Sequence, residues 1–296
     1  METGGASAPK SGALAAHPPE HGRLRVIKPA SFMPSAIWTG IRELMDYRDL
    51  LLAFTIHRIE VRYRQSILGL AWAILQPLTL MMIYTVIFSY LVHIPSNGPP
   101  YALFSYAALV PWTFFLPSIV TSASSLVAQK ELVTKVYFPR EIMPFTCVFA
   151  ALFDLLMACL VLACMMLAYH THVTAQIFMA IPIVLLAAIF VMAVSLVLSA
   201  FQVRFRDIGL AMPLVLQIVM YATPVVYPFS MVPQRFRALY VLNPMVGIIE
   251  NFRRVTVQGL GVDYMLMLPG LIVMIVFLPL AYLYFKRAEA NMADAI

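Results

Sequence analysis

One uncharged stretch limits the possible folds of this 296-residue chain more than any other feature. From Gln65 to Gln129 there is no Asp, Glu, Lys or Arg. A membrane hydrocarbon core about 30 Å thick is crossed by roughly 20 helical residues, so this stretch is too long for one span and suits two. In the whole chain 62% of the residues are apolar and 11% are charged, against about 45–50% and about 25% in soluble domains. We therefore predict an integral membrane protein, which excludes an ordinary soluble enzyme and a mostly disordered chain.

Charges and turn residues mark the limits of the spans. The uncharged stretch is divided at 93–100, where Pro, Ser, Asn and Gly form a turn signal. A second apolar region, 142–203, contains one charge, Asp154, and is divided near 169–174. Because isolated strands cannot satisfy their backbone groups in lipid, all spans should be helices. The sequence predicts an all-α protein with six transmembrane helices at about 67–92, 101–127, 142–169, 177–203, 208–234 and 264–285.

Two segments are neither spans nor simple loops. Residues 36–65 mix apolar and charged positions at helical spacing, which predicts an amphipathic helix at the cytosolic membrane surface. Residues 228–263 form a long external connection, where we expect short re-entrant gate helices because long unstructured loops are uncommon. The other predicted parts are a disordered cytosolic extension at 1–35, a transmembrane domain at 66–286 and a cytosolic tail at 287–296.

Positive charges indicate the orientation in the membrane. The segments 1–66, 128–141 and 204–207 and the C-terminal tail hold 16 of the 20 Lys and Arg residues, and loops rich in Lys and Arg stay in the cytosol. The first 25 residues also lack the apolar region of a signal peptide. Both termini are therefore expected in the cytosol. The net charge of +6 reflects this topology and does not indicate a nucleic-acid partner.

Sequence motifs for catalysis and cofactor binding are absent. There is no Walker A pattern, and the dipeptide Gly-Lys does not occur in the chain. No catalytic, cofactor or metal site is predicted. His170 and His172 are interpreted as parts of an exposed polar turn, and Cys147, Cys159 and Cys164 as packing residues. Energy for any work done by this chain would have to come from another protein or from a gradient.

Asp154 is the one acidic residue well inside a predicted span. Such a group can belong to a proton relay, or it can make a polar contact at a helix interface or cavity wall. No basic residue lies within a span to serve as its partner, and a lone acid makes a poor relay. The polar contact is the favoured interpretation, and the relay stays open.

Aromatic residues gather toward the external ends of two spans. Trp112, Phe114 and Phe115 lie in the second span, while Tyr221, Tyr227 and Phe229 close the fifth. An aromatic belt at the lipid interface explains them. A second explanation is a channel for sugars, because ring faces offer apolar and polar contact together.

Three segments carry a resemblance to a known family: 61–78 (VRYRQSILGLAWAILQPL), 130–144 (KELVTKVYFPREIMP) and 242–245 (LNPM). In this order, with six spans and a cytosolic amphipathic helix, they resemble the membrane subunits of type-2 ABC transporters. These subunits belong to exporters of lipid-linked polysaccharide of the O-antigen and teichoic acid group. The resemblance covers about residues 40–286.

The resemblance implies a transport subunit and not an enzyme. Two copies would form a homodimer in the cytoplasmic (inner) membrane and export an O-antigen-like polysaccharide, a step of lipopolysaccharide biosynthesis, through a channel at their interface. Two separate ATP-binding cassette subunits would bind ATP and Mg²⁺, and this chain would bind no cofactor. The 128–141 loop would dock on those subunits, and 228–263 would form an external gate.

The resemblance also implies three groups of site residues. The residues that couple the chain to the ATPase subunit would be Glu131, Lys135, Tyr137 and Arg140. The substrate's pyrophosphate would meet cytosolic arginines, which positive-inside topology also explains: Arg58, Arg62, Arg64, Arg204 and Arg206. With spans one and five at the interface, the aromatic residues of the channel would be Tyr84, Trp112, Tyr221, Tyr227 and Phe229.

Two other functions compete with the exporter. A proton-coupled secondary transporter using Asp154 would need no ATPase and would usually contain an internal repeat, yet 67–169 and 177–285 show no convincing repeat. A membrane enzyme acting on lipid-linked sugars would need an acid–base pair. The external loops offer only Glu250 and Asp263 for that purpose.

Overall fold

The computed structural model describes residues 40, 42–64, 66–96 and 98–295. Within these residues the chain is helical and contains no strand. Five helices are long and apolar enough to cross a membrane. The prediction of an all-α, multi-pass membrane protein is therefore confirmed, while the extension predicted at 1–35 lies outside the described residues.

The five long helices lie close to five of the six predicted spans. The first is α3 (Ala71–Tyr84), continued by the π-helix η1 (Thr85–Leu91). The second and third are α4 (Tyr101–Ala128) and α6 (Ile142–Ala168). The last two are α7 (Ala180–Arg204), preceded by the short η2 (Ala175–Met179), and α11 (Tyr264–Ala295).

The fifth predicted span, 208–234, is not one long helix. It contains α8 (Ile208–Tyr221), which has 14 residues and is therefore about 21 Å long. The helix ends because Pro224 has no N–H to donate and its ring disfavours helical backbone at Thr223. A turn follows and leads into the short η3 (Phe229–Met231).

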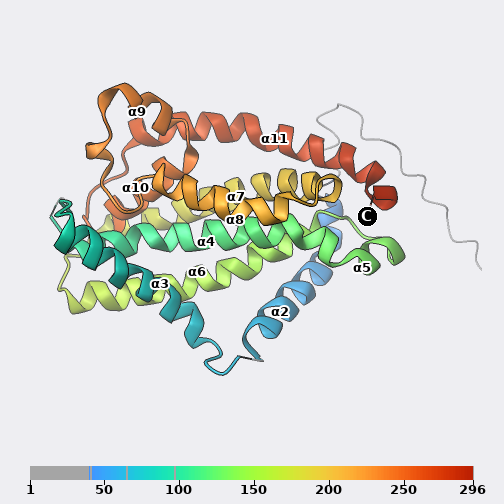
Figure 1. Ribbon diagram of the computed structural model, residues 1–296, viewed down its shortest axis with the longest axis horizontal. Helices are drawn as coiled ribbons and strands as arrows, with labels where there is room; N and C mark the ends of the chain where they lie inside the picture. Colours follow the sequence, from blue (N-terminus) through green and yellow to red (C-terminus); the bar gives the residue numbers. More distant parts are fainter. Residues whose placement is uncertain (1–39, 41, 65, 97, 296) are drawn as a thin grey trace, which may run out of the picture.

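The helices α4, α6, α7, α8 and α11 run along the long axis of the molecule, and α3 is inclined to them (Figure 1). At one end lie α9 (Gln234–Val241) and α10 (Pro244–Thr256), and at the other end lies α5 (Lys130–Lys135) with the C-terminus. We call these the α9 end and the α5 end. The helix α2 (Arg48–Arg64), within the segment predicted to be amphipathic, runs obliquely from the α5 end and packs against α6.

The core is built around α4, which contacts α3, α6, α7, α8 and α10. Most of α4 is buried, and many of its buried positions are small residues, among them Ala107, Ala108, Ser118 and Ser122. Small residues let helices approach closely, which drives helix association where water is absent. The Ser122 hydroxyl also donates to the Pro144 carbonyl of α6 at 3.1 Å.

Two short helices form the segment 228–263, where short helices were expected. Asn243 caps α10 by accepting a hydrogen bond from the Met245 N–H at 3.1 Å. Of the 13 residues of α10, 11 are buried. A Cβ atom on Gly247 would lie 3.0 Å from the Leu266 carbonyl oxygen, so the absence of a side chain at that position allows α10 to lie directly against α11.

Overpacking the centre of the bundle tests the role of α4. We expect Ser122→Leu to destabilise the protein by about 1–3 kcal/mol, because a larger side chain has no room between α4 and α6. The readout is the apparent melting temperature in detergent. The matched control is Ser124→Leu, since Ser124 is half-buried and its hydroxyl bonds only to its own helix. Equal melting temperatures for the two variants would contradict this account of the core.

Candidate functional site

The helix α5 presents charged residues at one end of the bundle. Glu131 and Lys135 form an i,i+4 ion pair at 3.3 Å, with side chains 87% and 72% exposed. Tyr137, just after the helix, is also exposed. On the opposite side Val133 is buried in a cluster that contains Leu126 of α4. The loop therefore has an apolar side fixed to the core and a polar side directed outward.

Arg140, the fourth predicted coupling residue, is directed instead toward α11. Its backbone N–H donates to the Glu289 carboxylate at 3.2 Å, and its guanidinium donates to the Glu289 carbonyl oxygen at 2.7 Å. The predicted set is thus divided into an exposed group on and beside α5 and one residue that anchors the loop to the last helix.

The sequence analysis missed Glu141, which strengthens this anchor. Its side chain is only 1% exposed and lies 2.9 Å from the Lys286 Nζ atom. Lys286 also pairs with Glu289 at 2.9 Å. Burial raises the pKa of the Glu141 carboxyl, and the charge of Lys286 acts against that rise. A buried ion pair of this kind requires both partners, so the loop and α11 are held at a fixed distance.

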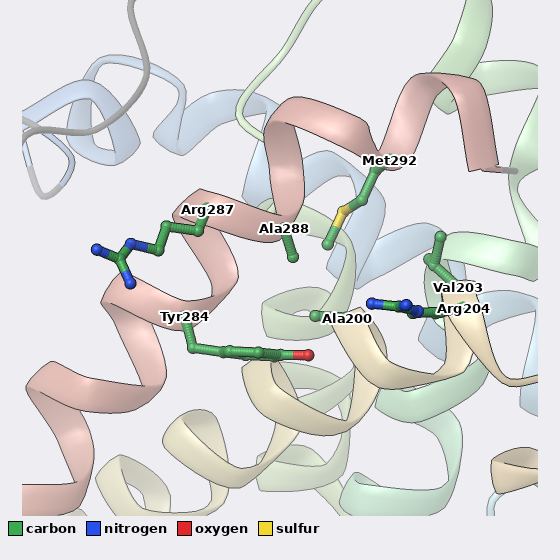
Figure 2. Close-up of a pocket in the computed structure, with 7 residues that line it drawn as sticks. All are labelled: Ala200, Val203, Arg204, Tyr284, Arg287, Ala288 and Met292. Atoms are coloured by element: carbon green, nitrogen blue, oxygen red, sulfur yellow. The ribbon is translucent and has the colours of Figure 1, made fainter.

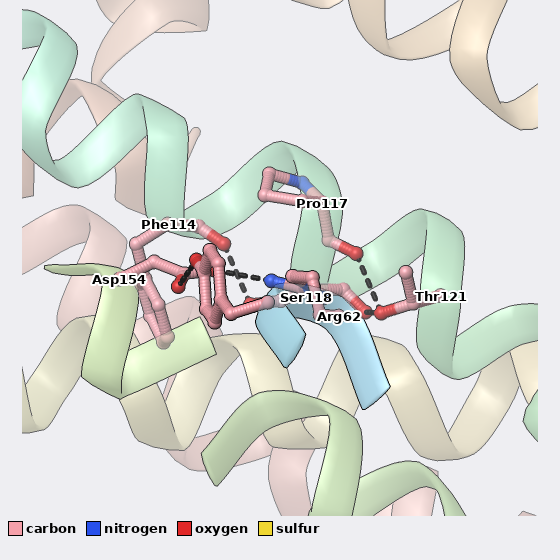
Figure 3. Close-up of polar contacts among 7 residues, drawn as sticks. Arg62, Phe114, Pro117, Ser118, Thr121 and Asp154 are labelled. Atoms are coloured by element: carbon pink, nitrogen blue, oxygen red, sulfur yellow. Dashed lines mark hydrogen bonds and ion pairs between the residues drawn. The ribbon is translucent and has the colours of Figure 1, made fainter. Parts of the chain in front are cut away.

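Asp154 of α6 makes a polar contact with α2. It accepts hydrogen bonds from the Arg62 guanidinium and from the Tyr63 hydroxyl (Figure 3). Burial, and next the hydrogen bond to Asp154, raise the pKa of Tyr63 to about 12, so the phenol stays protonated and donates. Asp154 has a basic partner that its own span sequence did not indicate, because α2 brings Arg62 to it from outside the spans.

The five arginines predicted for a pyrophosphate do not form one cluster. Arg62 lies at the level of Asp154, which is 12 residues into α6 and therefore about 18 Å along that helix. Arg58 is one turn earlier on α2, and Arg64 is exposed at the end of that helix. Arg204 and Arg206 are exposed at the end of α7, at the α5 end.

The helices α3 and α8 both contact α4, and one side-chain contact joins them. The Tyr84 hydroxyl of α3 contacts the Met220 sulfur of α8 at 3.6 Å, and both helices pack on α4. Their outer side is mostly apolar, but it also exposes Gln76, Thr79 and Gln217. Exposed glutamines are costly in contact with lipid tails. This face therefore suits contact with protein or water better than contact with lipid.

The predicted channel aromatics fall into two groups. Trp112 is 2% exposed and Tyr84 is 8% exposed, so both rings belong to the core of the chain. Tyr221 is half-exposed, and its carbonyl accepts a hydrogen bond from the Tyr227 hydroxyl at 2.8 Å. Phe229 lies under the Arg237 guanidinium, 5.9 Å from ring centre to charge. Only the second group lies near the surface.

Arg253 on α10 is a further residue that the sequence analysis missed. It is completely buried and lies 2.7 Å from Glu250 and 3.7 Å over the ring of Phe104. Its guanidinium also donates to the carbonyls of Pro224 and Val225 at 3.0 and 3.1 Å. A helix break leaves carbonyls without partners, and here a buried cation binds them. An arginine close after the apolar residues 245–249 was the available signal.

Among the described residues, no group of three or more His, Cys, Asp or Glu side chains could hold a metal ion. The arrangement defines a multi-pass helical protein whose charged groups serve helix contacts and one projecting loop, as expected for the membrane part of a transporter. A family model described as ABC-2 type transporter matches residues 50–257. Because the match covers more than half of the chain, the chain belongs to the ABC-2 type transporter family, and the resemblance stated from its sequence is confirmed.

Curated relatives cover most of the chain. The O-antigen export system permease protein RfbA of Myxococcus xanthus is 30% identical over 217 residues, 73% of this chain and 83% of the relative. A Klebsiella pneumoniae protein of the same name is 30% identical over 252 residues, 84% of this chain and 95% of the relative. The polysialic acid transport protein KpsM of Escherichia coli is 23% identical over 250 residues, with 82% and 95% covered.

Removing the buried arginine tests its role. We expect Arg253→Gln to destabilise the protein by about 3–5 kcal/mol, because Glu250 and the freed carbonyls lose a charged partner. The measurement is the apparent melting temperature in detergent together with protease resistance of 222–263. Arg254→Gln is the control, since Arg254 is half-buried and donates to one carbonyl, that of Gly261. If Arg254→Gln destabilised the protein as much as Arg253→Gln, the stabilising role assigned to Arg253 would be refuted.

Proposed function

We propose that this chain is the permease subunit of an ATP-driven exporter of an O-antigen-like, lipid-linked polysaccharide across the inner membrane. The observation that carries the proposal is its similarity, over 84% of its length, to an O-antigen export permease. The lack of a Walker A motif supports an ATPase on a separate chain. Two such ATP-binding subunits would each use ATP and Mg²⁺, and this chain would bind no cofactor.

In this proposal the chain crosses the membrane six times. The fifth crossing consists of α8 with the turn after it, which together replace one long helix. The α5 end is cytosolic, because α5 and the ends of α7 and α11 carry most of the described Lys and Arg residues outside α2 and 228–263. The helix α2 would begin on the cytosolic side and pack along α6 to the level of Asp154, deeper than the surface position predicted from the sequence. The helices α9 and α10 would form the external gate.

The α5 loop would receive the ATPase subunit. Its exposed residues, Glu131, Lys135 and Tyr137, would contact that subunit, while Arg140 and Glu141 hold the loop to α11. A rigid connection of this kind transmits a displacement without losing it in a flexible linker. The nucleotide cycle would thus move α11 and the core around α4 together.

The polysaccharide would pass between two copies of the chain, along the faces formed by α3 and α8. Gln76, Thr79 and Gln217 give these faces a polar component, and the half-exposed ring of Tyr221 offers a stacking surface near the external end. The tightly packed surroundings of α4 leave no comparable polar path inside one copy. Tyr227 and Phe229 would support the ring of Tyr221.

The pyrophosphate of the substrate would meet arginines that precede the two helices of the path. Arg64 lies just before the turn into α3, and Arg206 lies just before α8. Arg58 lies one turn before Arg62 on α2. Arg62 is bound to Asp154, so its role here would be to hold α2 in position.

The first test concerns coupling. We expect Glu131→Lys to reduce polysaccharide export by about tenfold or more with normal insertion, because the reversed charge disturbs docking, whereas an exposed ion pair contributes only about 0–1 kcal/mol to stability. The readouts are surface polysaccharide and ATP hydrolysis of the purified complex. The double variant Glu131→Lys, Lys135→Glu restores the pair in reversed order. Recovery of export in that double variant would show that the ion pair only stabilises α5. It would rule out a role of Glu131 in docking.

The second test concerns the path between copies. Single cysteines at Gln76 and Gln217, in a variant whose native cysteines are replaced by Ala, should be joined between two copies by thiol crosslinkers of graded length. Cysteines at Leu160 of α6 and Ile275 of α11 are controls, because both are exposed on other faces. Crosslinking at the control positions with none at Gln76 or Gln217 would exclude the α3 and α8 faces as the interface.

A further inference from the structure

The first half of α2 packs against the loop that carries α5. The ring of Phe54 meets the ring of Phe138 edge to face, with 6.3 Å between the ring centres. Phe138 follows α5 in the chain and is only 4% exposed. Leu50 and Leu51 of α2 pack against the same apolar cluster, which also contains Val133 of α5. The apolar side of the α5 loop therefore lies against α2.

The same cluster reaches two of the long helices. Ala200 and Val203 of α7 and Phe285 and Met292 of α11 are buried members of it. Figure 2 shows Ala200, Val203 and Met292 beside the pocket between the ends of these helices. Buried apolar side chains stay together because separating them exposes apolar surface. The α5 loop, the first half of α2 and the ends of α7 and α11 are thus joined in one packed unit.

The second half of α2 is held by the middle of α6. Arg62 and Tyr63 both donate hydrogen bonds to Asp154 (Figure 3). The Tyr63 ring also packs on Phe153, with 6.3 Å between the ring centres. Asp154 is 12 residues into α6, about 18 Å from the start of that helix. Because α2 has 17 residues and is about 25 Å long, it connects the α5 loop with this deeper level of the bundle.

Only a short turn separates α2 from α3. The helix α2 ends at Arg64, and α3 begins at Ala71. Backbone hydrogen bonds from Ser66 to Tyr63 at 3.3 Å and from Gly69 to Ser66 at 3.1 Å close the turn. Gly69 has a φ of 50°, which suits glycine. A hydrogen-bonded turn passes a displacement of α2 on to α3, whereas a flexible linker would absorb it.

We propose that Phe54 and Phe138 are positioning residues, which pass the movement of the α5 loop through α2 to α3. The inference rests on the proposed function, because it takes the α5 loop as the docking site of the ATPase subunit. A buried ion pair connects this loop to α11, and the ring contact adds a second connection, to a helix that borders the proposed path. The core around α4 and the helix α3 are then displaced together.

The first test separates ATP hydrolysis from export. It uses membrane vesicles that contain the chain, its ATPase subunit and the lipid-linked polysaccharide that accumulates in a strain lacking this permease. We expect Phe54→Ala and Phe138→Ala each to lower the polysaccharide exported per ATP hydrolysed by about fivefold or more, because the ring contact is lost and the exposed docking residues remain. The double variant should lose no more than the single ones, since both remove the same contact.

The matched control for these variants is Leu52→Ala. Leu52 is also on α2, but its side chain is 58% exposed, so the ratio of export to hydrolysis should stay at the level of the unchanged chain. A purely structural role of the two rings would lower hydrolysis and export together and leave their ratio unchanged. That result, or an equal loss in the control, would overturn the proposal.

A reversible crosslink tests whether the α5 loop and α2 move together. Phe54→Cys and Phe138→Cys are combined in a chain whose native cysteines are replaced by Ala, and a short reducible crosslinker joins the two thiols within one chain. We expect the crosslink to restore the ratio of the cysteine-free chain, because a covalent connection replaces the lost ring contact. Reduction of the crosslink should remove this gain. A crosslink that lowers export would show that the loop has to move away from α2, and it would overturn the proposal.

The remaining outcomes are also decisive. Normal ratios in both alanine variants would overturn the proposal, and if these variants are not inserted in the membrane, the crosslinked chain decides. Absence of ATP-driven export in the unchanged complex would overturn the proposed function itself, so the two failures can be distinguished.

Discussion

Charged side chains buried in an apolar bundle must find partners within the protein, because lipid supplies none. Arg62 binds Asp154 and joins α2 to α6, and Lys286 binds Glu141 and joins α11 to the loop after α5. Arg253 binds the Pro224 and Val225 carbonyls in the turn that follows α8. Apolar helices alone can slide against one another at little cost. These contacts fix the positions of the elements that border the proposed path and the coupling loop.

The positions of the spans could be predicted because charged residues are rare inside a membrane. Each span can therefore be recognised from its own residues, without knowledge of its neighbours. The limits of α4 and α6 follow directly from the nearest charges and turn residues. The fifth span shows where this reasoning stops. An uncharged run of 27 residues suited a long helix, yet Pro224 ends α8 early, and backbone geometry outweighs hydropathy there. Hydropathy alone does not report helix length.

The contacts between distant residues could not be predicted in the same way. Glu141 and Lys286 are separated by 145 residues, and no local pattern connects them. Trp112 lies 11 residues into α4 and is buried under neighbouring helices that single-sequence periodicity does not place. The exposed ion pair of α5 was easier to anticipate, because Glu131 and Lys135 are four residues apart within one helix.

Two ion pairs join residues that are far apart in the sequence, and they constrain the order in which the chain folds during its synthesis. Domains form as the chain is made from its N-terminus, and Arg62 precedes Asp154 by 92 residues. The helix α2 can therefore take its final place only after α3, α4 and much of α6 have been synthesised. Glu141 has to wait for Lys286, which comes close to the end of the chain. The loop that carries α5 is thus fixed by α11, so a nascent chain cannot hold this loop in its final position before α11 has been synthesised.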